Sequence, residues 1–230
     1  MAKKHTEVEK NEAVVDVELV YSKAEEFIHK NQIQILASIG AIVFIILGYY
    51  SYNRFYLGPL ETEAQGQMFV AEQYFQKDSF DIALNGDATY LGFLDIADEY
   101  GSTNAGNLAE YYAGICYLRL GQYEDALTHL DKFDSDDLIL SAIVLGASGD
   151  AHMELGDAEK ALAFYEKASK KSDNEFTTPV YLMKAGLASE KVGSFDKAVT
   201  YYSEIKENFA TSIEGRNAEK YLARAQAQLK

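Results

Sequence analysis

The chain has 230 residues, with 36 acidic and 21 basic side chains and a formal net charge of −15 at pH 7. Such an acidic surface disfavours nucleic acid and anionic lipid headgroups as partners, and its simplest role is to keep an exposed domain soluble. The single cysteine, Cys116, cannot form an intramolecular disulfide, and we predict a small core residue there rather than a reactive thiol. The four histidines lack the spacing of metal ligands, so we expect no metal site and no cofactor.

A polar arm, residues 1–30, precedes the first apolar segment. We expect its first part, residues 1–12, to be unstructured. Residues 18–30 are predicted to form a helix that continues into the next segment and lies on the inner membrane surface or packs on a neighbour. The apolar strip of this helix consists of Leu19, Val20, Phe27 and Ile28.

A long uncharged segment follows the arm, since no charged residue lies between Lys30 and Arg54. About 20 apolar residues are needed to cross the hydrocarbon layer, so we predict one transmembrane helix over residues 31–56. A buried core helix is disfavoured because the chain has no comparable apolar partner for it. A cleaved signal peptide is disfavoured because the apolar run starts late and has no small-x-small site before Arg54. The aromatic residues expected at one interface are Tyr49, Tyr50, Tyr52, Phe55 and Tyr56.

The distribution of basic residues predicts the orientation of this span. Before the span the chain has five basic residues, and in the first stretch after it only Arg54 and Lys77. Basic residues remain on the cytoplasmic side, and acidic ones weigh little in this rule. We therefore expect the arm in the cytoplasm and the remainder of the chain in the periplasm. The five basic residues are Lys3, Lys4, Lys10, Lys23 and Lys30.

One phrase occurs three times beyond the span, as LGQYEDAL at 120–127, LGDAEKAL at 155–162 and VGSFDKAV at 192–199. Its period is close to the roughly 34 residues of a tetratricopeptide repeat (TPR). The glycine is expected to end a first helix in a left-handed conformation, and the following alanine to lie where the second helix crosses the first. We predict three helical hairpins over residues 107–206.

The flanks of the phrase fit the same hairpin. Each first helix has a small pair before the turn, at 113–114, 148–149 and 185–186, where two helices can approach. The tryptophan usual in TPRs is absent, with Leu145 and Leu182 at its place, which indicates a variant repeat. Thr178 is expected to cap the third hairpin, with a proline at its first helical position. The bulky residues expected to close the second helices are Leu130 and Phe133, Tyr165 with Ala168, and Tyr202 with Ile205.

A degenerate first hairpin with an insertion is predicted over residues 57–106. Asp78 stands at the position of the turn glycine, and Ala83 lies further before Ala126 than one period allows. The excess falls around residues 85–87, a turn sequence, after which residues 90–100 are expected to complete the hairpin. At the other end, residues 207–230 are predicted to cap the solenoid, through an amphipathic helix over residues 214–229.

The predicted fold class is therefore all-α, with one N-terminal transmembrane helix followed by a TPR-type α-solenoid. No nucleophile–base pair, phosphate loop or glycine-rich fingerprint accompanies the acidic residues, so we do not expect an enzyme. A calcium loop at residues 134–137 is disfavoured, because the glycine and later glutamate of that pattern are missing. Acidic residues that open the next helix explain this segment better.

The order of arm, span and degenerate repeats resembles the YfgM-like ancillary subunits of the SecYEG protein-conducting channel. The amino-acid sequences of residues 106–114 and 174–179 also resemble those of membrane-anchored TPR proteins of Bacteroidota bacteria. The resemblance implies a protein of the bacterial inner membrane that passes exported polypeptides to periplasmic chaperones, with a PpiD-like foldase as companion. The chain departs from that family by the insertion near Asn85 and by the missing tryptophans.

The groove face of the repeats is the predicted site. It lacks the Lys and Asn residues of the TPR clamp that binds C-terminal carboxylates, and its mixture of apolar and acidic groups suits an extended or helical protein segment. Packing between repeats is the alternative role for each residue. The predicted residues are Leu108, Tyr111, Ile115, Arg119, Ile143, Asp150, Met153, Glu154, Met183, Leu187 and Glu190.

Two other functions remain open. One is a scaffold in a different envelope assembly or secretion machine. The other is a regulator whose cytoplasmic arm senses a partner while the repeats control another membrane protein. No cysteine lies near the N-terminus, which argues against a lipid-anchored outer-membrane protein.

Overall fold

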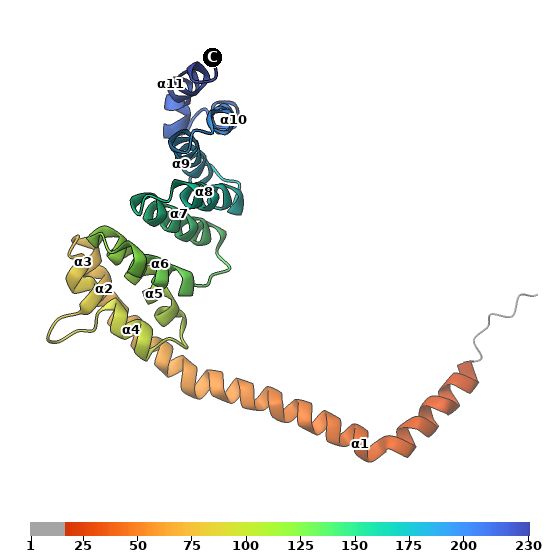
Figure 1. Ribbon diagram of the computed structural model, residues 1–230. Coiled ribbons are helices and arrows are strands. Elements are labelled where there is room, and N and C mark those ends of the chain that lie inside the picture. The colour runs from red at the N-terminus through yellow and green to blue at the C-terminus, as the bar shows by residue number, and fades with distance from the viewer. Residues whose placement is uncertain (1–16) are drawn as a thin grey trace, which may run out of the picture. The chain divides into compact units, whose positions relative to one another are not determined.

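The computed structural model describes residues 17–230, with side chains from residue 21 onward, so the lead predicted over residues 1–12 lies outside the described residues. The chain divides into two compact units, one up to Tyr56 and one from Leu57 to Lys230, and each is considered by itself. All regular elements of the described residues are helices, which confirms the predicted all-α class (Figure 1).

The first unit contains one long helix, α1 (Val17–Tyr52), followed by the π-helix η1 (Asn53–Leu57). Asn31 interrupts α1 with non-helical angles, φ −111° and ψ 17°, and α1 is visibly bent (Figure 1). The Asn31 side-chain amide donates a hydrogen bond to the carbonyl oxygen of Phe27 at 2.9 Å, which satisfies an acceptor beside the break. The described residues before Asn31 are helical, as predicted for 18–30.

Side chains on the apolar part of α1 have no protein around them. Within the described residues, one helical run, Tyr21–Gln76, is long and apolar enough to cross a membrane by length and composition, with a mean hydropathy of 2.1 in its most apolar window and none of that window buried. Ile33 and Phe44 are 83 % and 77 % exposed. Leaving many such side chains in water is costly, at about 1.5–3 kcal/mol for each large one.

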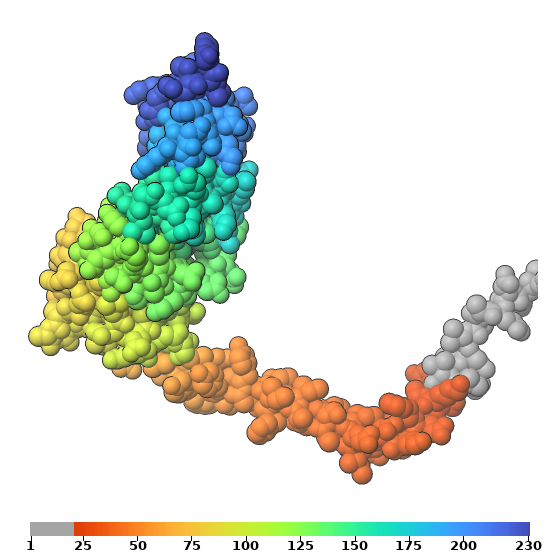
Figure 2. All heavy atoms as spheres, in the orientation of Figure 1, coloured from red at the N-terminus to blue at the C-terminus, as the bar shows by residue number. Residues whose placement is uncertain are grey.

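The second unit is a series of helices in which successive hairpins stack on one another, and side chains fill the space between them (Figure 2). The three regular hairpins are α5/α6, α7/α8 and α9/α10. The helices of this unit are α2 (Gly58–Gln76), α3 (Phe80–Asn85), α4 (Phe93–Glu99), α5 (Asn104–Leu120), α6 (Tyr123–Lys132), α7 (Leu138–Glu154), α8 (Ala158–Lys171), α9 (Thr178–Lys191), α10 (Phe195–Asn208) and α11 (Ile213–Ala227).

The hairpin turns are left-handed at the predicted positions. Gly121, Gly156 and Gly193 have φ angles of 78°, 82° and 79°. Asp78, which takes the same place in the first hairpin, has φ 57° and is the non-glycine residue with positive φ in the described chain. Glycine adopts this conformation without a steric penalty, whereas aspartate does so at some cost. The turn geometry is therefore common to all four hairpins.

Close approach of the two helices in a hairpin also confirms the prediction from small residues. A Cβ atom at Gly149 would lie 2.5 Å from the ring of Tyr165, and one at Gly186 would lie 2.3 Å from the ring of Tyr202. In the first regular hairpin, Gly114 faces Leu130 in the same way, at 2.7 Å. Each bulky residue of the second helix thus occupies the space above a glycine of the first.

The first hairpin differs, because its second helix is divided into α3 and α4. The interrupting loop is fastened by a hydrogen bond from the Tyr74 hydroxyl to the Asp87 carboxylate at 2.7 Å. The second half, α4, was predicted to begin at residue 90 but begins at Phe93. The reason is that residues 87–90 form a turn, closed by a hydrogen bond from the Asp87 amide to the Tyr90 carbonyl. The insertion therefore divides the second helix of the first hairpin into α3 and α4.

Three further boundaries differ from the prediction. The first regular hairpin begins at Asn104 rather than 107, since Thr103 caps α5 by accepting a hydrogen bond from the Gly106 amide. The third begins at Thr178, so the cap position belongs to Thr177. At the C-terminal end α10 extends to Asn208, beyond the predicted 206, whereas the capping helix α11 lies close to the predicted 214–229.

The junction between α6 and α7 is the least packed of the regular repeats. α6 has 10 residues whereas α8 and α10 each have 14, and the chain then continues through an extended segment to Asp137, which caps α7. The buried cluster at this junction consists of only Leu130, Val144 and Ala147, with partly buried neighbours. A short second helix therefore leaves open space on both sides of the junction.

Candidate functional site

A groove of about 660 Å³ crosses the repeats where α5, α7 and α9 lie beside one another. Because first helices of successive repeats line the same face, residues about one repeat apart meet there. Tyr111, Ile115, Ile143 and Met153 give this groove an apolar and aromatic lining. Charged and tyrosine side chains lie among these apolar ones, so the groove has a mixed polar and apolar surface.

The structure brings together most of the predicted site residues. Those that line the groove are Tyr111, Ile115, Arg119, Ile143, Asp150, Met153 and Glu154.

Four predicted residues lie elsewhere. Leu108 lines two smaller hollows near α2 and the loop after α6. Met183 packs against the core of α9, α10 and α11, and Leu187 is 40 % exposed outside the groove. Glu190 accepts hydrogen bonds from the Tyr202 hydroxyl and from Arg224, so its carboxylate links α9 to α10 and α11. Met183, Leu187 and Glu190 all belong to α9, so the assignment by repeat position fails mainly on this helix.

Asp150 is occupied by its own protein. Its carboxylate accepts a hydrogen bond from the Tyr165 hydroxyl at 2.7 Å and forms an ion pair with Lys184, also at 2.7 Å. Burial, followed by the charge of Asp150, raises the pKa of Tyr181 to about 12 and raises the pKa of Tyr165 further, so both hydroxyls remain protonated donors. Asp150 therefore joins α7, α8 and α9 and has little capacity left for a ligand.

Arg119 and Glu154 supply the charge that remains available in the groove. Both side chains are exposed at its rim, and neither forms an ion pair within the part of the chain that the structure describes. They come from α5 and α7, so opposite charges lie at two places along the groove. A segment of protein with apolar side chains and complementary charges would match this arrangement.

Several groove residues were not predicted from the sequence. Lys184 lies next to the predicted Met183 and one repeat after Asp150, so its charge and spacing could have identified it. Tyr123 and Tyr165 could not be found in this way, since they belong to the second helices α6 and α8 rather than to the face of the first helices. The additional lining residues are Phe75, Leu118, Tyr123, Ala147, Tyr165, Tyr181 and Lys184.

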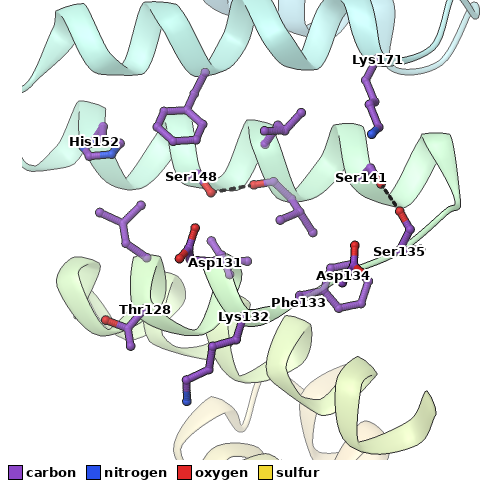
Figure 3. A pocket seen from close by; sticks show the side chains of 15 residues that line it. Thr128, Asp131, Lys132, Phe133, Asp134, Ser135, Ser141, Ser148, His152 and Lys171 are labelled. Atoms are coloured by element: carbon purple, nitrogen blue, oxygen red, sulfur yellow. Dashed lines mark hydrogen bonds between the residues drawn. The ribbon is translucent and has the colours of Figure 1, made fainter. Parts of the chain in front are cut away.

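A second hollow, of about 760 Å³, lies on another face of α7, between α6 and α8 (Figure 3). Its hydroxyl groups already have partners, because Ser148 donates to the Val144 carbonyl and Ser141 donates to the Ser135 carbonyl. His152 stacks on Phe164 at 5.2 Å between ring centroids, and burial lowers the pKa of this histidine. The polar groups therefore do not converge on a ligand, and the short α6 accounts for this space.

Titratable side chains elsewhere serve to join helices. Glu110 on α5 lies 2.5 Å from the Nδ1 atom of His129 and 3.3 Å from the Nζ atom of Lys132, both on α6. Among the described residues, no group of three or more His, Cys, Asp or Glu side chains is placed to hold a metal ion. Cys116 is buried, and burial raises its pKa to about 12.

Comparison with known proteins identifies the repeat. A family model described as a tetratricopeptide repeat matches residues 108–136, which cover most of α5, all of α6 and the segment after it. No curated protein matches the chain. A crystal structure of nearly identical TPR-like repeats, assigned to a kinesin light chain of Podosopora anserina, is 14 % identical, covers 74 % of this chain and 87 % of its own, and superposes with a TM-score of 0.56.

At this level of identity the structural match shows the fold alone. With the family match, it establishes a TPR-like α-solenoid. Such solenoids are typically non-enzymatic modules that bind other proteins.

Proposed function

We propose that this chain is a non-enzymatic, membrane-anchored scaffold whose groove across α5, α7 and α9 binds a segment of another protein. The observation that carries the proposal is the groove itself, in which apolar residues such as Ile115 and Ile143 lie among polar ones and Arg119 and Glu154 have exposed charges. The occupant is an extended or helical segment whose apolar side chains meet the apolar residues of the groove. Asp150 is not available to bind a charged group of this segment, because its carboxylate is already paired with Lys184.

The proposed location is the inner membrane of a bacterium, crossed once by the apolar part of α1. The support is the length and apolar composition of this helix, together with the excess of basic residues before it. The arm then lies in the cytoplasm and the repeats in the periplasm. In this arrangement the clients of the groove are exported polypeptides.

The partner proposed for the scaffold is the Sec translocon, with a PpiD-like periplasmic foldase as companion. Support for this part comes from the resemblance in the order of arm, span and degenerate repeats. The chain would then pass polypeptides that leave the channel to periplasmic chaperones. A scaffold or regulator in another envelope assembly or secretion machine is the alternative, since TPR solenoids serve as binding modules in general.

Site-specific photo-cross-linking tests the groove. A photoreactive residue replaces Met153 in the groove or, as a control, the exposed Glu159 on α8, and the full chain is expressed in its bacterial host. We expect adducts with polypeptides at Met153 and few at Glu159. Equal yields at the two positions would refute the groove as the binding site.

Charge reversal refines the same test. Arg119→Glu and Glu154→Lys should each reduce the adduct yield several-fold while thermal unfolding stays unchanged, since neither side chain forms an ion pair within the described residues. Asp150→Asn provides the contrasting control, because it removes the ion pair with Lys184 and should lower stability. A groove that binds only through shape would be insensitive to both reversals.

Affinity purification after cross-linking in intact cells tests the partner. Recovery of Sec channel subunits and a periplasmic foldase is the expected result. Recovery of neither, with adducts still formed at Met153, would reject the translocon and retain the scaffold. Deletion of residues 1–30 tests the alternative of a regulator. A channel subunit anchored by the span and the repeats should keep its partners without the arm, whereas a regulator that works through the arm should lose them.

A further inference from the structure

We propose that the part of α1 before its bend, with side chains described from Tyr21 to Lys30, lies along the membrane surface. Its partner is the boundary between the lipid headgroups and the acyl chains, with no requirement for charged lipid. The inference rests on the proposed membrane anchoring and adds a second contact with the same membrane. Three observations carry it, namely the apolar face of this segment, the break at Asn31 and the balance of charge.

The apolar side chains of this segment share one face. At 100° per residue, Tyr21, Ala24, Phe27 and Ile28 fall within an arc of about 120°. Tyr21 is 75 % exposed, Phe27 64 % and Ile28 55 %, so nothing in the described protein covers this face. An amphipathic helix with such a face binds at a bilayer surface by burying it at the level of the headgroups.

The break at Asn31 lies where a surface helix would have to turn into the bilayer. The helical angles fail at this residue, which follows the last charged residue before the uncharged segment, Lys30. The Asn31 amide satisfies the Phe27 carbonyl at 2.9 Å, so the bend leaves that acceptor bonded. The bend at Asn31 therefore allows the charged part of α1 before it and the uncharged part after it to have different directions.

The charge of the segment identifies which part of the membrane it fits. Lys23 and Lys30 balance Glu25 and Glu26, so residues 21–30 have no net charge with His29 neutral. Attraction to anionic headgroups requires clusters of basic residues, which this segment lacks. Its binding should therefore come from the apolar face and be independent of anionic lipid.

Spin labels on the full chain in phosphatidylcholine vesicles test the proposal. Single cysteines replace Ala24 and Ile28 on the apolar face and Glu26 and His29 on the polar face, with Ile42→Cys in the span as a reference. The native Cys116 is replaced by alanine, although its burial and raised pKa already make it slow to label. The measurement is the collision rate of each nitroxide with oxygen, which concentrates in the bilayer, and with a water-soluble nickel complex.

We expect the ratio of oxygen to nickel collisions to be several-fold higher at positions 24 and 28 than at 26 and 29, and unchanged when anionic lipid is added. Equal, water-like ratios at all four positions, with a bilayer-like value at 42, would overturn the surface helix alone. A water-like ratio at 42 as well would instead overturn the membrane anchoring on which it rests. Spin–spin coupling at 28 that disappears on dilution with unlabelled chain would assign the face to a second copy and also overturn the proposal.

A matched pair of substitutions tests the cause. Phe27→Gln removes a large apolar side chain from the face and should lower the oxygen-to-nickel ratio at position 24 several-fold. Glu26→Gln changes the polar face and should leave this ratio unchanged. Equal effects of the two substitutions would contradict burial of the apolar face.

Discussion

The hairpins α7/α8 and α9/α10 achieve close packing by a different route from the first hairpin, α2 with α3 and α4. In these two of the three regular hairpins a glycine faces a buried tyrosine, at Gly149 with Tyr165 and at Gly186 with Tyr202. The first hairpin has a divided second helix, and in place of this contact it shares an aromatic cluster with α5. Its aromatic members are Phe75, Phe80, Phe93 and Tyr112.

The difference teaches that the repeat phrase requires a turn and a close helix crossing but not particular core residues. A glycine gives space for one large ring, and the tyrosine hydroxyl then reaches an acidic partner, Asp150 for Tyr165 and Glu190 for Tyr202. The first hairpin has only the left-handed turn in common, at Asp78. Its stability should therefore depend on other residues.

The largest expected effect comes from removing a buried tyrosine of a regular hairpin. Tyr202 is 0 % exposed, so Tyr202→Ala should lower the free energy of unfolding by about 3–5 kcal/mol through loss of burial and the cavity left behind. Tyr202→Phe keeps the ring and should cost only about 1 kcal/mol for the lost hydrogen bond to Glu190. Urea unfolding of the full chain in mild detergent measures both.

The exposed Phe69 on α2 is the control for this pair. At 62 % exposure, Phe69→Ala should change the free energy of unfolding by less than about 0.5 kcal/mol. A loss at Tyr202 no larger than the loss at Phe69 would show that the glycine–tyrosine contact does not support the regular hairpins.

Adding a methyl group at the facing glycine should have the next largest effect. A Cβ atom at residue 186 would lie 2.3 Å from the Tyr202 ring, so Gly186→Ala should cost about 1–3 kcal/mol through overpacking. Gly66→Ala in α2 is the matched control, since no atom lies within 4 Å of its Cβ position. That substitution should stabilise the chain by about 0.5–1 kcal/mol because alanine is the better helix former. Changes of the same sign at both glycines would contradict the close crossing.

Alkaline pH should weaken the regular hairpins through their buried tyrosines. Burial raises the pKa of Tyr181 from 10 to about 12, and burial likewise raises the pKa values of Tyr165 and Tyr202. The folded state thus retains these protons, so their contribution is fully present below pH 10 and is lost as the pH rises from 10 towards the folded pKa. Each tyrosine should lose about 1.4 kcal/mol per pH unit in this window. The slope of unfolding free energy between pH 10 and 11 should fall in Tyr181→Phe, and an unchanged slope would refute the assignment.

The smallest effect is expected at the turn that all hairpins share. Asp78→Gly should stabilise the first hairpin by about 0.5–1 kcal/mol, since Asp78 has φ 57° and glycine adopts positive φ at lower cost. The reverse exchange, Gly156→Asp at φ 82° with open space around it, should cost about 1 kcal/mol. Thermal unfolding compares the two, and effects of equal sign would mean that the turns are not equivalent.

Much of the second unit could be predicted because its repeat is local in sequence. The left-handed glycines, the small residues of the first helices and Asp78 at the degenerate turn were all identified from spacing. The start of α4 was misplaced, since the turn sequence at residues 85–87 does not show that the Asp87 hydrogen bonds extend the turn to Tyr90. The cap of α9 was shifted by one residue, because Thr177 and Thr178 are neighbouring residues of the same type.

The candidate groove was only partly predictable. Residues of α5 and α7 were assigned to one face by repeat position and line the same groove in the structure. Counting by repeats failed in α9, where Lys184 lines the groove but Leu187 and Glu190 do not. The stacking angle between hairpins determines this difference, and it depends on the side chains that fill each junction.

The sequence by itself determined the helical class, the period of the repeat, the left-handed turns and the uncharged segment of α1, because each depends on residues close together along the chain. Only the tertiary structure decided that Asp150 is paired with Lys184, that Arg119 and Glu154 lie along one groove, and that α1 bends at Asn31. The first two depend on how far one hairpin rotates on the next, and the third on a side-chain hydrogen bond that the local sequence permits but does not require.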